Sequence, residues 1–356
     1  MPWVNALEFR TRNNELLYNR QQYALRLDIE NPLKVIQNKR YFETQQQLSN
    51  LKREHAIKNE LTKRYLMLIQ LMEIKSNFSI RIKGDSLAQR LFDAIRSKVG
   101  LPGFDGSDLI DAKLDIISRQ ADLREAEFDF SDLELRITRL SGLTGGEIKD
   151  LGVHLQPSQI SLVFDSIRQG LNLVEVMEKA KAVELAARKM AVDKASYTMG
   201  WVQGMYVPYK REEGERPSGL ALGLTIPIFN KNKDDQARDQ LEVLEKEAEL
   251  EQLKFDVGEQ WVSRKESLRH LLEQYRSVSK QLETLKNADF KALSITADYD
   301  PVPGIKLNLE LIKFDLLLNK IRYSVMREWI HLLDESDIIG QFPLRNYLSS
   351  NFERLD

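Results

Sequence analysis

The sequence has no cysteine among its 356 residues, which excludes disulfide bonds, thiolate zinc sites and cysteine nucleophiles. It also has no run of eighteen apolar residues, so we expect no transmembrane helix, and its N-terminus shows no apolar signal segment. The formal net charge is −2 and the Lys and Arg residues are scattered. A dedicated nucleic-acid binder is therefore not expected.

Proline is absent between Pro32 and Pro102, where apolar residues recur at spacings of three and four. The same pattern returns from Asn230 to Asp300, and both stretches predict long amphipathic helices, the first with a possible break near Gly84. About 55 residues would span roughly 80 Å. Such helices need neighbouring helices along their whole length.

A short stretch of strict alternation precedes each long helix. Tyr23, Leu25, Leu27 and Ile29 alternate with polar or small residues, as in a strand with one wet face. In the second copy the apolar positions are Leu220, Leu222, Leu224, Ile226 and Ile228. Each strand has an expected antiparallel partner upstream, which in the second copy would place Met199, Trp201, Met205, Val207 and Tyr209 on one face.

Each long helix is followed by a turn rich in Gly and Pro and by a return helix. An offset of about 202 residues superposes Asp108-Leu-Ile on Glu310-Leu-Ile, so the chain is read as two structural repeats of a β-hairpin followed by long coiled-coil helices. The predicted divisions are 3–31 (first hairpin), 32–141 (helices of repeat 1), 142–157 (glycine-rich connector), 158–196 (a helix to the second hairpin), 197–229 (second hairpin), 230–338 (helices of repeat 2) and 339–356 (tail).

The stretch Gly219-Leu-Ala-Leu-Gly-Leu-Thr-Ile-Pro-Ile-Phe-Asn230 resembles the step from strand to helix in the bacterial outer-membrane efflux proteins, the TolC-like family. The acid-Leu-Ile start of the return helices and the repeat-ending Leu140-Ser-Gly142 support the resemblance. It implies a mainly α fold with a β part, in which a trimer builds a 12-stranded membrane β-barrel that continues as an α-helical periplasmic tunnel. It also implies a signal peptide and a helix before the first strand, and we expect this sequence to lack both.

The resemblance implies that the protein is no enzyme but a passive exit duct in the bacterial outer membrane, within a tripartite efflux or type I secretion system. The implied partners are two further copies of the chain, a periplasmic adaptor (membrane fusion) protein, an inner-membrane transporter and outer-membrane lipid. No cofactor, metal or nucleic acid is implied. In the family, acids early in the return helices narrow the tunnel entrance, and the matching positions are Asp108 and Glu310, with Asp111 one turn on and Lys313 after Glu310.

Two other interpretations of these acids and of the chain stay open. Acids in the first turn of a helix are ordinary partners of the helix dipole, Ser107 is a plain N-cap candidate, and Glu310 and Lys313 have the spacing of a simple ion pair. The chain as a whole also fits a soluble coiled-coil interaction or adaptor protein with β-hairpin ends. The four histidines have no metal-ligand spacing, and Gly142–Gly146 lacks the Lys-Ser/Thr of a phosphate loop.

Overall fold

The computed structural model describes residues 4–13, 21–102, 104–142, 145–150, 155–170, 173–195, 200–208, 218–224, 233–296 and 300–354. The chain divides into two compact units, Met1–His55 with Val174–Asp256 and Ala56–Leu173 with Val257–Asp356. None of the described helices is both long enough and apolar enough to cross a membrane. The elements are β1 (Val4–Asn13), β2 (Gln21–Ile29), α1 (Pro32–Arg96), α2 (Gly106–Ser141), α3 (Gly145–Asp150), α4 (Pro157–Val163), η1 (Phe164–Ser166), α5 (Val174–Lys194), β3 (Gly200–Tyr206), β4 (Ser218–Leu224), α6 (Lys233–Thr296) and α7 (Pro301–Glu335).

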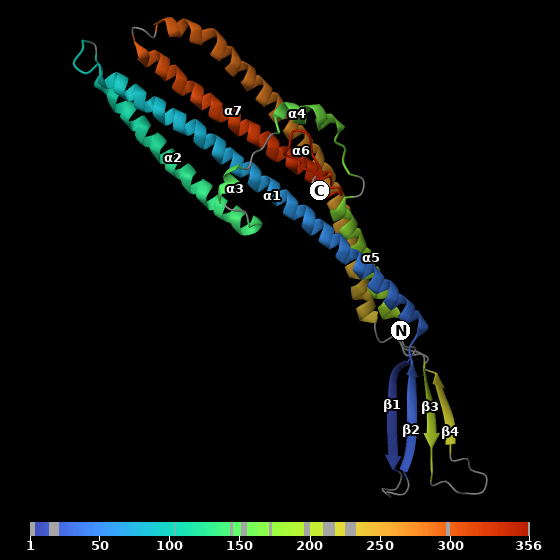
Figure 1. Cartoon of the computed structure of the whole chain (residues 1–356). Helices are drawn as coiled ribbons and strands as arrows, with labels where there is room; N and C mark the ends of the chain where they lie inside the picture. The colour runs from blue at the N-terminus through green and yellow to red at the C-terminus, as the bar shows by residue number, and fades with distance from the viewer. Residues whose placement is uncertain are drawn as a thin grey trace. The chain divides into compact units, whose positions relative to one another are not determined.

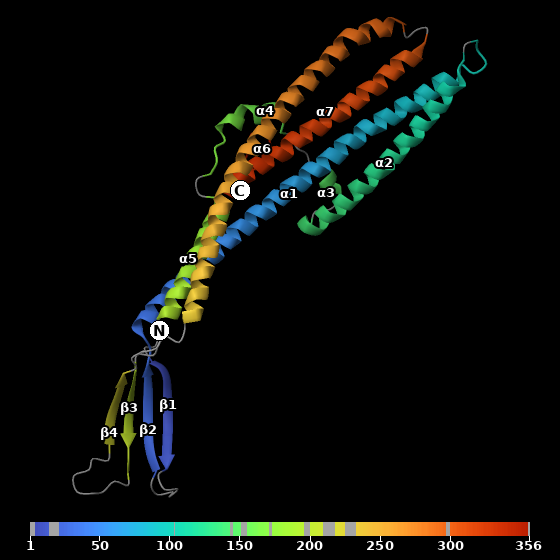
Figure 2. The same cartoon turned by 180° about the vertical axis from the view of Figure 1, so that it is seen from behind.

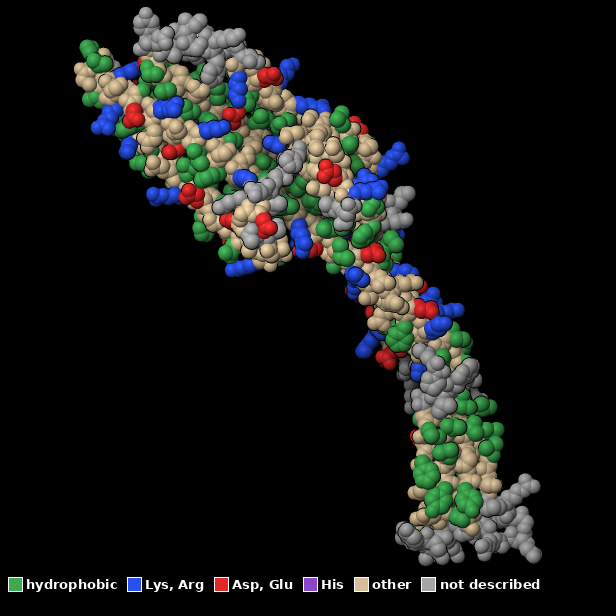
Figure 3. Space-filling model, in the orientation of Figure 1, with side chains coloured by type: hydrophobic (Ala, Val, Ile, Leu, Met, Phe, Trp, Pro, Cys, Tyr) green, Lys and Arg blue, Asp and Glu red, His purple; other side chains and the backbone are tan. Residues whose placement is uncertain are grey.

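The first unit contains one antiparallel sheet of four strands in the order β1-β2-β3-β4 (Figure 1). The alternation predicted for Tyr23–Ile29 is confirmed, because Phe9 pairs with Leu25 and Leu7 with Leu27. The register continues with Leu27 opposite Val202 and Val202 opposite Leu222. One face of the sheet is therefore apolar across all four strands, and apolar side chains are visible over the strands in Figure 3.

Trp201 and Met205 share one face of the third strand, as predicted, but that face is the polar one and not the apolar one. Trp201 pairs with Asp28 and Met205 with Ala24, so both lie on the polar face with Gln203. Trp201 fits there because Gly223 stands opposite it, where an added Cβ would lie 2.4 Å from the indole. The Arg26 guanidinium stacks 4.9 Å from the centre of the Trp201 ring. The expected facing of Met199 and Tyr209 lies outside the described residues.

In the first unit, α1 begins shortly after β2 ends. Asn31 caps α1, since its Oδ1 accepts from the Leu33 amide at 3.0 Å. Its Nδ2 donates to the Ala195 carbonyl, which follows the last residue of α5, at 2.9 Å. Ion pairs join α5 to α6 along their length, for example Lys179 with Glu249 at 2.8 Å and Lys189 with Glu242 at 2.9 Å.

In the second unit, α2 lies beside α1 and α7 beside α6 in both views (Figures 1 and 2). Gly84 does not break α1, which runs for 65 residues, about 100 Å. An added Cβ at Gly84 would stand 3.0 Å from Arg119 and 3.2 Å from Ile312. The absence of a side chain at Gly84 therefore lets α2 and α7 pack closely against α1. The break predicted at this glycine was wrong.

The largest core of this unit gathers on α7, where Trp329, Ile330 and Leu333 are almost completely buried. The segment after α7 closes this core, because Tyr347, Leu348 and Phe352 pack into it. A second, smaller core lies where α1, α2 and α7 approach their connecting turns, and consists of Ala88, Leu91, Ile95, Ala112, Ile116 and Leu309.

The single helix predicted over 158–194 is instead two separate helices, α4 and α5, and η1 follows α4 directly. The carbonyl of Ile167 accepts a hydrogen bond from Lys265 Nζ at 3.1 Å, and Ile167 is extended. A side chain about a hundred residues away thus binds the carbonyl that a continued helix would use, so local periodicity could not reveal the break. The predicted connector 142–157 likewise contains a short helix, α3.

Candidate functional site

Two aspartates fix where the return helices α2 and α7 begin, just after the segments that follow α1 and α6. Asp105 caps α2, where its side chain accepts from the Ser107 amide at 2.9 Å, and the helix begins at Gly106. The N-cap is therefore Asp105 and not the expected Ser107. Asp300 caps α7 in the same way, accepting from the Val302 amide at 3.0 Å, and Pro301 supplies the fixed φ suited to a first helical position.

Lys98 lies in the turn after α1 and forms an ion pair with Asp300, the N-cap residue of α7. Its Nζ lies 2.7 Å from the carboxylate of Asp300. This ion pair and the hydrogen bond from the Val302 amide both favour the ionised carboxylate, and together they hold the pKa of Asp300 below its ordinary value of 3.8. The two helix hairpins of the second unit are therefore linked at their turns by one charge-assisted contact.

A test of this link follows from its pH dependence. Because the folded-state pKa of Asp300 is lowered, its stabilisation is fully present above the ordinary aspartate pKa and is lost as the pH falls through the folded value. We expect Asp300→Ala to lower the thermal midpoint of unfolding at pH 7, and the difference from the wild type to shrink below about pH 4. Asp129→Ala, which changes an exposed acid of α2, is the control. A difference that stays constant from pH 7 to pH 3 would contradict the assignment.

The four residues predicted as a constriction line one groove of about 520 Å³. Asp108 and Asp111 come from α2, while Glu310 and Lys313 come from α7. The apolar part of the lining is formed by Leu91, Ile95, Ala112, Leu307 and Leu309, and most of these residues belong to the smaller core. Rigid helices thus hold the charged side chains around an opening with a packed base.

The charges of this groove are mixed. Lys306 Nζ lies 3.4 Å from Asp108, Lys313 Nζ lies 2.6 Å from Glu310, and Arg119 lies 2.8 Å from Asp115. Four carboxylates and three cationic side chains line the groove, a formal charge of −1. The Lys306–Asp108 and Lys313–Glu310 pairs are exposed, so each contributes little to stability and is screened by salt, whereas the Arg119–Asp115 pair is half-buried. The expected pairing of Glu310 with Lys313 is present in the structure.

The two repeat-related acids differ in their helical positions. Asp108 lies in the first turn of α2, where the helix dipole favours a negative charge. Glu310 is the tenth residue of α7, because that helix begins at Pro301, well before the predicted start. The dipole interpretation therefore applies to Asp108 and not to Glu310. Sequence reasoning missed Lys306, Asp115 and Arg119, although Lys306 precedes Glu310 by one helical turn and so shares its face.

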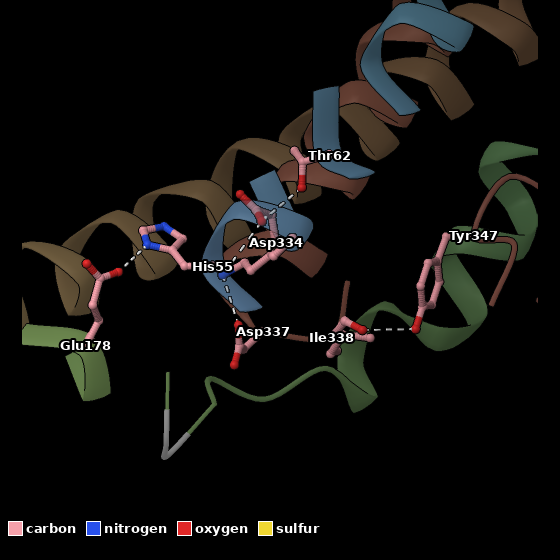
Figure 4. Close-up of polar contacts among 8 residues, drawn as sticks. His55, Thr62, Glu178, Asp334, Asp337, Ile338 and Tyr347 are labelled. Carbon is pink, nitrogen blue, oxygen red and sulfur yellow. Dashed lines mark hydrogen bonds and ion pairs between the residues drawn. The ribbon is translucent and has the colours of Figure 1, made fainter. Parts of the chain in front are cut away.

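A buried polar cluster at the other end of α7 was not foreseen. Lys58, a buried side chain of α1, lies 3.0 Å from Asp337 and 3.7 Å from Asp334. Thr62 donates to Asp334 at 3.0 Å, as Figure 4 shows. The contacts join residues more than 270 positions apart and fasten the end of α7 to α1, so we assign them a structural role.

The three histidines that the structure describes do not form a metal site. His55 contacts Glu178 at 2.7 Å within the first unit (Figure 4), and His154 lies outside the described residues. Among the residues that the structure describes, no group of three or more His, Cys, Asp or Glu side chains is placed to hold a metal ion. Gly142, the first residue of the glycine-rich connector, is the C-cap of α2. Its backbone is in the left-handed region with φ 71°, and its amide donates to the Thr138 carbonyl at 2.9 Å.

Solved structures of bacterial outer-membrane channels resemble this arrangement of a four-stranded sheet and two long helix hairpins. The outer membrane protein VceC of Vibrio cholerae superposes with a TM-score of 0.69 at 10% identity, over 93% of this chain and 85% of that one. The protein described by this sequence has the fold of the outer-membrane channels. The CmeC outer membrane channel of Campylobacter jejuni gives a TM-score of 0.68 at 11% identity, over 93% of this chain and 76% of that one.

The open state of the Neisseria gonorrhoeae MtrE outer membrane channel matches with a TM-score of 0.61 at 14% identity, over 93% of this chain and 79% of that one. Comparison of the sequence with protein-family models and with curated proteins gives no match. At these identities the likeness is one of fold. It agrees with the predicted class, a mainly helical chain with a small antiparallel sheet.

Proposed function

We propose that this protein is a subunit of a bacterial outer-membrane channel that serves as the passive exit duct of a tripartite efflux or type I secretion system. The observation that carries the proposal is the sheet, which combines an exposed apolar face with a polar face on a chain of the channel fold. Leu220, Leu222 and Leu224 are between 70% and 84% exposed. Leaving such side chains in water costs about 25 cal/mol per Å² of apolar surface, a cost that lipid removes.

The strand edges favour an assembly of several copies. Within the described sheet, β1 and β4 each have one neighbouring strand, so each has one unpaired edge. A membrane does not tolerate unpaired strand edges, and four strands are too few to close a barrel. Pairing β1 of one copy with β4 of the next would satisfy both edges. Three copies would then form a 12-stranded barrel, with the polar face turned to the lumen and the apolar face to outer-membrane lipid.

In this proposal the groove carrying Asp108, Asp111, Glu310 and Lys313 belongs to the periplasmic entrance of the duct. Three symmetry-related copies would place three sets of these charges around one opening, where they would bias the passage of ions. Energy and cargo selection would come from an inner-membrane transporter, joined through a periplasmic adaptor protein.

The deciding experiment is single-channel recording in a planar bilayer, with the full chain purified in non-ionic detergent and its oligomeric mass determined. Stable conductance from a trimer is expected. A protein that stays soluble without detergent, forms no trimer and never conducts would exclude the channel and favour the coiled-coil adaptor interpretation.

The entrance charges can be tested on the same recordings. We expect Asp108→Ala, Asp111→Ala and Glu310→Ala each to weaken block by a trivalent cation several-fold, because each removes one negative charge from a groove of formal charge −1. Lys306→Ala and Lys313→Ala should strengthen the block for the same reason. Asp129→Ala, an exposed acid of α2 that does not line the groove, is the matched control and should leave the block unchanged. Unaltered block in all the groove variants would remove the constriction assignment.

A further inference from the structure

A second pocket in the larger core is separate from the charged groove. It has a volume of about 400 Å³, within the range of small-molecule sites. Three parts of the second unit form its walls: Val163 and Ile167 from the end of α4 and the residues after it, Trp329 and Leu333 from α7, and the segment after α7. None of its lining residues belongs to the constriction proposed above.

One residue of the pocket wall, Trp329, has a buried indole N–H that makes no hydrogen bond within the described residues. Trp329 is 2% exposed and lines the pocket, and its indole Nε1 has no hydrogen-bond partner among the residues that the structure describes. Buried indole N–H groups normally find an acceptor, and one left without an acceptor destabilises the fold. Trp261, by contrast, donates its Nε1 to Ser336 at 3.0 Å. This nitrogen of Trp329 has almost no accessible surface, so Trp329 contributes the face of its ring to the pocket wall and not its N–H.

The pocket also contains a positioned positive charge. The backbone of Arg345 is held firmly, because its carbonyl accepts from Tyr65 Oη at 2.7 Å and the residue pairs with Arg354 in an isolated β-bridge. Its side chain is exposed, and within the described part of the chain no carboxylate forms an ion pair with it. Burial raises the pKa of Tyr347, and the charge of Arg345 opposes that effect, which agrees with the guanidinium lying close to this ring.

The rest of the lining is apolar and partly aromatic. Phe352 lies 6.1 Å from the Trp329 ring and 6.3 Å from the Tyr347 ring. Tyr347 Oη donates to the Ile338 carbonyl at 3.2 Å, which fixes the ring (Figure 4). Phe342 is 82% exposed at the pocket although it is a large apolar side chain. Apolar walls with one guanidinium suit a ligand that has an apolar body and a single anionic group.

We propose that this pocket binds a small monoanionic carboxylate with an aliphatic or aromatic body. The carboxylate pairs with Arg345 and the apolar body packs against Phe352, Leu333 and Ile167. The site is independent of the proposed channel function, because its walls lie wholly within one unit and share no residue with the charged groove.

Isothermal titration of the full-length protein with octanoate tests the proposal, with 1-octanol as the uncharged ligand of equal chain length. The wild type is expected to bind octanoate saturably and more tightly than 1-octanol. Arg345→Gln should weaken octanoate binding at least fivefold and leave 1-octanol binding unchanged. Arg354→Gln, which makes the same charge change at the bridge partner outside the pocket, should behave as the wild type.

A second variant separates the pocket from general surface binding. Val163→Trp places an indole in the pocket and should abolish the binding of both ligands, with the circular dichroism spectrum of the wild type retained. Failure of the wild type to bind octanoate saturably would overturn the proposal. So would equal octanoate affinity in Arg345→Gln and Arg354→Gln, or full binding by folded Val163→Trp.

Discussion

Gly200→Ala is expected to prevent β3 and β4 from pairing at the end of the sheet. A Cβ at this position would lie 2.1 Å from the carbonyl oxygen of Gly223 and 3.3 Å from the Cα of Leu224. Real Cβ atoms do not approach a backbone oxygen so closely, so the strands would have to separate. Each backbone group left unpaired away from water costs about 1–3 kcal/mol, and separation would leave several such groups unpaired at once.

We expect Gly200→Ala to lose most of its stable assembly, measured as the fraction of protein that elutes as an oligomer in non-ionic detergent. Gly204→Ala is the matched control on the same strand, because an added Cβ there meets nothing within 4 Å. Gly223→Ala should also assemble poorly, since its Cβ would collide with the Trp201 ring. Trp201→Ala should restore assembly to Gly223→Ala and not to Gly200→Ala. Equal assembly by Gly200→Ala and Gly204→Ala would show that the strands do not pair in this register.

Ile330→Ala is expected to destabilise the second unit by about 2–5 kcal/mol. Ile330 is 0% exposed and belongs to the larger core, where Met326 and Leu333 are also buried. Removal of its branched side chain loses buried apolar area and leaves a cavity that neighbouring helices close only in part. The loss is measured from the denaturant midpoint of the helical unfolding transition.

Leu317→Ala is the control for helix α7. This leucine is 42% exposed, so the same truncation should cost less than about 1 kcal/mol. Both changes keep a good helix former in the same helix, so the comparison isolates burial from helix propensity. Similar midpoints for the two variants would contradict the position of the core.

The sequence determined the kind and order of the strands and of the long helices. The proline-free stretches predict α1 and α6, and the alternation of Leu25 and Leu27 with polar residues predicts which face of β2 is apolar. These properties are local, because a helix or strand with one buried face has apolar residues at the spacing of its own period. The resemblance also named Asp108, Asp111, Glu310 and Lys313 together, and the structure places all four in one groove.

The tertiary structure alone decided what depends on distant partners. The break after α4 follows from Lys265 binding the Ile167 carbonyl, and the facing of Trp201 follows from the room left by Gly223 on the next strand. The ion pair of Asp108 with Lys306 joins α2 to α7 through two residues that are 198 positions apart in the sequence. The pocket at Trp329 and Arg345 arises only when the segment after α7 folds back onto the core. Periodicity records the environment averaged along one element, whereas these contacts are set by single side chains that meet only after the helices and strands have packed.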